Sequence, residues 1–150
     1  MGETIRNRES SKENVKSVEW VKDITKKELG TLKDEIKSPA LNQILNGKDS
    51  FYVEKNGKIR YNVPAVKAFL KWTIDNPDKA AKLNTGVIKT LAIQIALEVN
   101  GYDVGKVDGI RGRSTIAQLR KFQADKKIKV DWKPGPQTVN ALHDALSYLR

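Results

Sequence analysis

Apolar residues recur at helical spacing in the first part of the chain. Most of them fall three or four positions apart, on one side of a helix: Val15, Val18, Val21, Ile24, Leu29, Leu32 and Ile36. This spacing predicts an amphipathic helix, and Ser10 with Glu13 fits a capping box at its start. Gly30 is a predicted break, because glycine is a poor helix former. The lysine-rich opposite face is interpreted as solvated, with a surface for an anionic polymer as the alternative.

The middle of the chain has a pattern typical of a β-hairpin. Within residues 51–63, two β-prone runs flank Asn56-Gly57, the dipeptide that favours a two-residue type I′ turn. In that register Tyr52 lies opposite Tyr61 and Glu54 lies opposite Ile59. We expect the tyrosines to belong to the core, with stacking on sugar or base rings as the alternative. A lone hairpin is marginal in water, so it must pack on helices.

Short helices are predicted on both sides of the hairpin. Ser38-Pro39 begins one that runs through Leu45, and Pro64 begins another. Asn76-Pro77-Asp78 ends that helix and begins a third. The residues expected to point inward from the third helix are Ala80, Ala81 and Leu83.

Three further helices are predicted in the last part of the chain. The first is largely buried, spans residues 87–100 and ends at Gly101, after which Tyr102 folds back onto the helix end. Ile128 and Val130 are expected to return across the core. The inward residues of the other two helices are Ile116, Leu119 and Phe122, and then Val139, Leu142, Leu146 and Leu149.

One local pattern occurs twice in this part. Val107-Asp108, Gly112, Thr115 and Leu119 recur as Val130-Asp131, Gly135, Thr138 and Leu142, each 23 residues later (130 − 107, 142 − 119). The aspartates predict Asx-type loop bonds. The glycines predict a backbone conformation that a Cβ resists, and they can also serve as helix N-caps. The fold class is therefore mainly α, with residues 1–84 as a helical region that carries the hairpin and residues 85–150 as a compact three-helix domain.

Composition narrows the chemistry. The net charge of +10 favours anionic partners such as nucleic acid, acidic membranes or wall polymers. The chain has no cysteine and only His143, so a Cys/His zinc site cannot be built from it, and we expect no metal and no cofactor. No apolar run approaches a membrane span, and residues 1–14 lack the hydrophobic region of a signal peptide.

Residues 87–146 resemble the peptidoglycan-binding domain, a three-helix bacterial cell-wall-binding module found beside cell-wall hydrolases and transpeptidases. The residues that carry the resemblance are Ile93-Gln94, Leu97, Gly101-Tyr102, Gly105, Val107-Asp108-Gly109-Ile110, Gly112, Thr115, Leu119, Phe122-Gln123, Val130-Asp131 and Gly135-Pro136-Gln137-Thr138. Two positions depart from the family pattern: Arg111 replaces an aromatic residue and Trp132 replaces glycine. Residues 1–86 resemble no family.

The resemblance implies a non-catalytic module that binds peptidoglycan and anchors a protein to the bacterial cell wall, in the cell envelope or outside the cell. Aspartates 108 and 131 are interpreted as loop staples, and Tyr102, Phe122, Val107 and Val130 as core. The candidate ligand contacts are side chains that the core and the loop staples do not need, with Tyr102 as a marginal member: Arg111, Arg113, Gln123, Trp132 and Tyr102. Arginine can fork onto stem-peptide carboxylates, and tryptophan offers a flat face to a sugar ring.

Other classes of function stay open. A Cys-based enzyme is excluded, and a zinc amidase generally needs two histidines. A glycosidase needs two placed carboxylates, and nothing distinguishes acids such as Glu54 or Asp75. The fold could instead serve a nucleic-acid or anionic-polymer binder, or a scaffold domain of a phage particle or secretion apparatus. A cytoplasmic or phage-associated location is compatible with the missing signal peptide.

Overall fold

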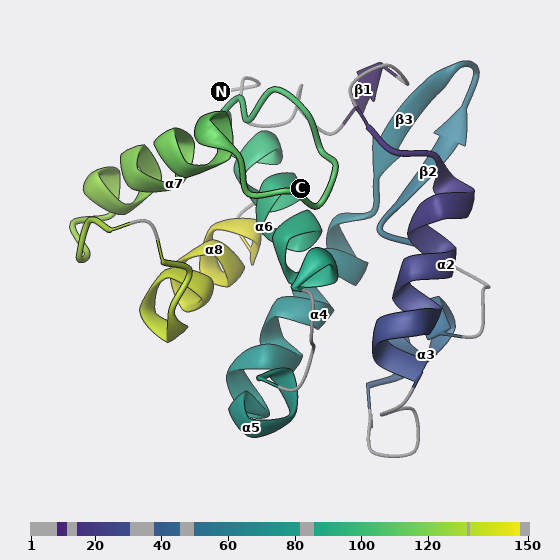
Figure 1. The fold of residues 1–150 in the computed structure, drawn as a ribbon, viewed down its shortest axis with the longest axis horizontal. Coiled ribbons are helices and arrows are strands. Elements are labelled where there is room, and N and C mark those ends of the chain that lie inside the picture. The colour runs from purple at the N-terminus through teal and green to yellow at the C-terminus, as the bar shows by residue number, and fades with distance from the viewer. Residues whose placement is uncertain are drawn as a thin grey trace.

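The structure is a computed structural model that describes residues 9–11, 15–30, 38–45, 50–81, 86–131 and 133–147. It is mainly helical, as predicted (Figure 1). The described elements, in chain order, are β1 (Glu9–Ser11), α2 (Val18–Leu29), α3 (Pro39–Leu45), β2 (Tyr52–Lys55), β3 (Lys58–Tyr61), α4 (Val63–Asp75), α5 (Pro77–Ala80), α6 (Val87–Val99), α7 (Arg113–Asp125) and α8 (Pro136–Ser147). None of the helices in these ranges is long and apolar enough to cross a bilayer.

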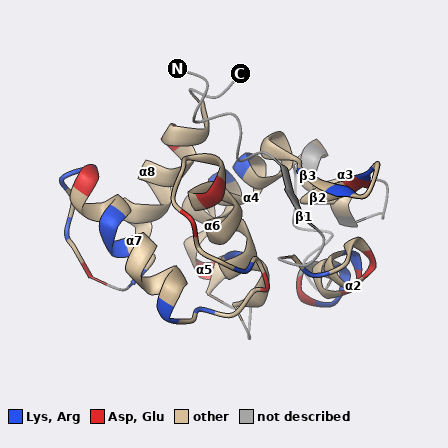
Figure 2. Cartoon of the chain, turned by 90° about the horizontal axis from the view of Figure 1, so that it is seen from above, with Lys and Arg blue, Asp and Glu red and all other residues tan. Residues whose placement is uncertain are grey.

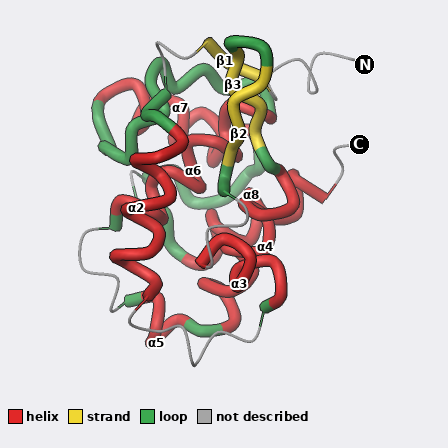
Figure 3. The backbone as a smooth tube through the Cα atoms, turned by 90° about the vertical axis from the view of Figure 1, so that its right-hand side faces the viewer, coloured by secondary structure: helices red, strands yellow, loops and turns green. Residues whose placement is uncertain are grey.

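The start of the first helix differs from the prediction. Ser10 lies in β1, where it pairs with Ile59 of β3, so the predicted cap at Ser10 is wrong. The N-cap of α2 is Ser17, whose hydroxyl accepts the N–H of Trp20 at 3.1 Å. Helix α2 ends with Gly30 as its C-cap, at the position of the predicted break, and Leu32 and Ile36 lie outside the described residues. Because the outer edge of β3 offers unpaired backbone groups, β1 adds to the hairpin and completes a three-stranded sheet of order β1-β3-β2 (Figure 3).

The predicted hairpin is confirmed with its register. Asn56 and Gly57 have φ of 55° and 78°, as a type I′ turn requires, and Tyr52 pairs with Tyr61. Both rings are buried and meet edge to face at 6.1 Å between centroids. The Tyr52 hydroxyl donates to the carbonyl of Lys16, just before α2. The tyrosines therefore belong to the core rather than to a stacking surface.

Helix α4 is the element around which the others gather. It begins after Asn62, whose side chain accepts the N–H of Ala65 at 3.4 Å. It packs against α3, α6 and α8, so in Figure 1 α2 and α3 lie to one side and α7 and α8 to the other. The short α5 follows and buries none of its residues. Ala81, predicted to point inward, is exposed, and Leu83 lies outside the described residues.

Helix α6 is buried along most of its length. Every residue from Leu91 to Leu97 is buried, and the chain leaves the helix through Gly101 at φ 90°, a left-handed conformation that suits glycine. Helices α7 and α8 both contact α6, and α8 also contacts α4. Side chains of all these helices join one hydrophobic core with those of α3 and the sheet. The division of the chain at residue 84 stays a prediction.

Two expectations for this part are corrected. Val107 is 1% exposed, whereas Val130, predicted to lie in the core, is 53% exposed. Gly112 caps α7 as predicted, but its φ of −86° and the open space around it require no special conformation. Leu149 lies outside the described residues.

Candidate ligand-binding surface

The two loops that join α6 to α7 and α7 to α8 are each held by a buried glutamine. We call residues 100–112 the first loop and residues 126–135 the second loop. Gln94 of α6 faces the first loop, and Gln123 of α7 faces the second. Both side chains are 0% exposed. A buried primary amide destabilises a fold unless its donors and acceptor are satisfied, so the partners of each glutamine define the geometry of its loop.

In the first loop, Gln94 bonds both ends of the turn. Its Oε1 accepts the N–H groups of Asp108 and Gly109 at 3.1 and 2.9 Å. Its Nε2 donates to the carbonyl of Ile110 and to Oγ1 of Thr115, both at 3.0 Å. Because an amide nitrogen has only two hydrogens, its third contact, with Oδ1 of Asp108 at 3.3 Å, is the weakest. We call this set the first brace.

The second brace repeats the first. Oε1 of Gln123 accepts the N–H of Asp131 at 2.9 Å, and Nε2 contacts Thr138 Oγ1 and Asp131 Oδ1 at 2.9 and 3.0 Å. The carbonyl of Lys133 takes the place of that of Ile110, at 3.3 Å. The loop partners again differ by 23 residues (131 − 108, 133 − 110, 138 − 115). The sequence repeat is therefore a repeat of one hydrogen-bonded loop.

The two aspartates act as loop staples, as predicted. Oδ1 of Asp108 accepts the N–H of Ile110, and Oδ1 of Asp131 accepts that of Lys133, each at 2.9 Å and two residues ahead. The bond from Lys133 lowers the pKa of Asp131, with smaller contributions from Gln123 and from the charges of Lys129 and Lys133. Hydrogen bonds to an ionised carboxylate favour the charged form. The carboxylates of the repeat thus hold backbone groups.

Gly109 brings the first loop against the start of α6. Its φ is 78°, and a Cβ at this position would lie 2.6 Å from Cγ1 of Val87. Glycine alone permits both the conformation and the close approach. The first loop is therefore seated on the first turn of α6, which places Arg111 beside Lys89.

Tyr102 links the end of α6 to α7. Its N–H bonds the carbonyl of Leu97 at 2.9 Å, and its ring meets Phe122 edge to face at 5.5 Å. The hydroxyl donates to Asp125 at 2.6 Å, and burial with this bond raises the pKa of Tyr102 to about 12. The predicted fold-back of Tyr102 is confirmed, and its hydroxyl serves a contact within the protein.

The other candidate contacts do not share one place. Arg111 and Arg113 are both exposed, but Arg111 lines a hollow with Lys89 and Lys133, whereas Arg113 lines another with Lys106. Gln123 is wholly buried in the second brace, which argues against direct contact with a ligand. Trp132 lies outside the described residues.

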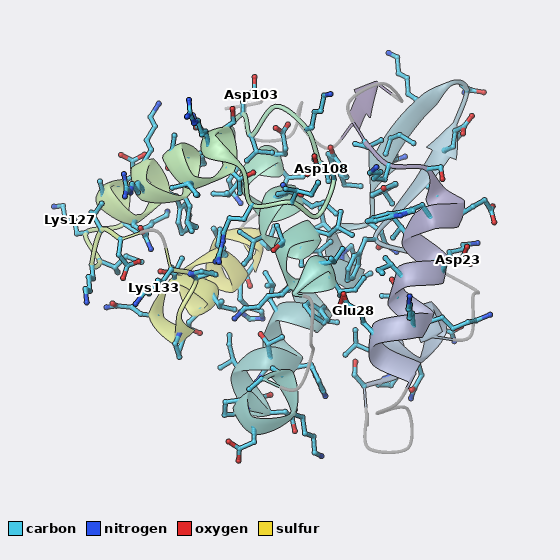
Figure 4. The ribbon with its side chains drawn as sticks, viewed as in Figure 1. Asp23, Glu28, Asp103, Asp108, Lys127 and Lys133 are labelled. Atoms are coloured by element: carbon cyan, nitrogen blue, oxygen red, sulfur yellow. The ribbon has the colours of Figure 1, made fainter. Side chains whose placement is uncertain are left out.

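Sequence reasoning missed two cationic residues of this surface. Lys89 is the charged residue of the first turn of α6, in a helix whose other residues are mainly apolar, and that contrast was the available signal. Lys133 occupies the position in the second copy of the repeat that Ile110 occupies in the first, but only the structure shows that it lies near Arg111. Figure 4 shows Lys133 near the start of α8 and Glu28 between α2 and the start of α6.

Residues 89–142 match the family model described as a putative peptidoglycan binding domain. The matched segment contains both braces and both loops, so the resemblance stated from the sequence is confirmed over these residues. No curated protein matches the chain, and no solved structure does.

Proposed function

We propose that the chain is a non-catalytic module that binds peptidoglycan and anchors the protein that carries it to the bacterial cell wall. The observation that carries the proposal is the family match over residues 89–142. The finer arrangement proposed with it is a three-helix bundle of α6, α7 and α8 with the two loops at its rim. The repeated brace supports this arrangement, because it sets the start of α7 against α6 and the start of α8 against α7 in the same way.

The chemistry of the loops supports binding rather than catalysis. Asp108 and Asp131 are engaged with backbone N–H groups of their own loops. The surface instead offers cations, among them Arg111 and Lys133, and exposed apolar side chains such as Ile110, which is 64% exposed. Figure 2 shows Lys and Arg at several places along α7. Cations beside apolar groups suit a polymer that carries carboxylates on sugars and short peptides. The proposed location is the cell envelope or the exterior of the cell.

The same cations favour one competing function, the binding of nucleic acid or another anionic polymer. Phosphate contacts depend steeply on salt, because each one releases counterions. Competition with DNA therefore separates the two functions.

The decisive experiment is co-sedimentation of the full chain with purified peptidoglycan sacculi. We expect the protein to pellet at low salt and to remain bound when excess duplex DNA is added. Arg111→Ala should weaken pelleting several-fold, and the matched control Lys121→Ala, an exposed cation on α7, should not. Trp132→Ala should also weaken it. A chain that stays in the supernatant at low salt, or that DNA fully removes from the pellet, would contradict the proposed function.

A further inference from the structure

Two hollows adjoin where α4 and α5 meet the family-matched helices. The first has a volume of about 310 Å³ and is lined mainly by apolar residues: Ile74, Pro77, Ala80, Ala81 and Val139. The second, of about 410 Å³, contains Lys89, Arg111 and Lys133. Lys89 lines both, and Pro136 of the first follows Gly135 of the second. We call the two together the composite groove.

The cationic half of the composite groove concentrates positive charge. Burial lowers the pKa of Lys89, and the charge of Arg111 lowers it further. No Asp or Glu belongs to the described lining of either hollow. Among the described carboxylates, Asp131 interacts with the charge of Lys133. Glu28 accepts the N–H of Ile88 at 3.5 Å from the α2 side, away from Lys133 in Figure 4. An anion bound beside Lys89 and Arg111 would relieve the repulsion between these two cations.

The walls of the composite groove are set in place by the fold. Gly109 presses the first loop onto Val87, and the first brace holds the backbone on both sides of that contact. The second brace holds the carbonyl of Lys133. The apolar half comes largely from residues 74–81, outside the matched segment 89–142, so the family-matched residues alone would lack that wall.

We propose that the composite groove binds the carboxyl-terminal end of a short peptide with small apolar side chains. The methyl groups lie in the half formed by α4 and α5, and the terminal carboxylate lies among Lys89, Arg111 and Lys133. This inference rests on the proposed function, because the alanine-bearing stem peptides of peptidoglycan have this chemistry. Burial of each methyl group contributes about 0.8 kcal/mol, and charge-assisted hydrogen bonds orient the carboxylate.

The test titrates the full chain with N-acetyl-D-alanyl-D-alanine and with its C-terminal amide, followed by amide NMR shifts. We expect the free acid to shift resonances of Lys89, Ala80 and Ala81 and to bind at least about tenfold more tightly than the amide, a difference of about 1.4 kcal/mol. Equal binding of acid and amide would overturn the assignment of the carboxylate. Binding of inorganic phosphate with no binding of either peptide would overturn the peptide as the ligand.

Two variants locate the site. Lys89→Met removes the charge but keeps the length of the side chain, and Ala81→Glu places a carboxylate in the apolar half. Each should weaken binding of the free acid at least about tenfold, while the matched exposed controls on α7, Lys121→Met and Ala117→Glu, should leave it unchanged. Far-UV circular dichroism checks that all four variants are folded. Unchanged affinity in both groove variants would overturn the site.

The same variants separate this inference from the proposed function. Wild-type chain that pellets with sacculi but binds neither peptide would overturn the groove and leave the function standing. Wild-type chain that binds the acid through Lys89 but does not pellet would overturn the function and leave the groove's ligand standing.

Discussion

The two loops have the same internal bonds but different surroundings. In each, a buried glutamine reaches across to an aspartate and a threonine of the following turn. Yet Val107, within the first loop, is 1% exposed, and its repeat partner Val130, within the second loop, is 53% exposed. A local pattern thus determined the hydrogen bonds of both loops, but it did not determine which of them is covered.

The cover over the first loop comes from the N-terminal segment. Val15 forms a parallel bridge with Val107, and the N–H of Lys16 bonds the carbonyl of Val107 at 3.2 Å. The same segment is tied to the sheet through the hydroxyl of Tyr52. The first loop is therefore integrated with the region outside the family match, and Val130 of the second loop faces solvent.

The largest expected effect tests whether the braces are equivalent. Gln94→Met and Gln123→Met keep the side-chain length but leave buried partners unsatisfied, each of which costs about 1–3 kcal/mol. We expect each variant to lower the free energy of unfolding by about 3 kcal/mol, measured by urea denaturation. The control Gln137→Met, at an exposed position of α8, should change it by less than about 0.5 kcal/mol. A large cost at one glutamine and almost none at the other would show that the two loops are not held alike.

The second prediction concerns the cover itself. Val107→Ala removes two buried methyl groups and should lower the free energy of unfolding by about 2 kcal/mol, since large-to-small changes in a core lose both transfer energy and packing. Val130→Ala, at an exposed site, should change it by less than about 0.5 kcal/mol. The same urea titrations measure both. Equal costs for the two valines would mean that Val130 is covered in solution.

Features with a local cause could be predicted from the sequence. The Asn56-Gly57 turn, the end of α6 at Gly101 and the aspartate staples each depend on residues a few positions apart. The glutamines also carried a signal, because Gln94 and Gln123 each precede a loop aspartate in the repeat. We interpreted Gln123 as a surface contact, although a polar residue among the apolar positions of a helix also fits a buried brace.

Features that depend on distant segments could not be predicted. β1 has only three residues, and it pairs with β3, about fifty positions later in the chain (59 − 10). Val130 lies in the same local pattern as Val107 but is exposed, whereas Val107 is covered by residues 15–16. No local sequence rule predicts that contact. The composite groove likewise needs α5 beside the start of α8, which the chain order of the helices does not reveal.

The smallest expected effect tests a contact of the first loop that the repeat does not copy. Glu98 accepts the N–H of Val104 at 2.8 Å, whereas the equivalent position in α7 and its loop is Lys127 (98 + 29, the spacing of Gln94 and Gln123). Burial raises the pKa of Glu98 to about 7, the bond from Val104 opposes that rise, and nearby Asp103 adds to it. In the unfolded chain the pKa of Glu98 is near 4.5, so the protonated carboxyl of Glu98 favours folding most below pH 4.5.

The contribution of Glu98 to the free energy of unfolding should decline as the pH rises from about 4.5 through about 7. Because the side chain is partly exposed, we discount the shift to about 1 kcal/mol. Glu98→Gln keeps an acceptor for Val104 and does not titrate, so its stability relative to wild type should improve by about 1 kcal/mol between pH 4 and pH 8. Urea titrations of both proteins at several pH values measure this. A difference between the two proteins that does not change with pH would mean that Glu98 ionises as in the unfolded chain, and that its contact with Val104 is not sensitive to pH.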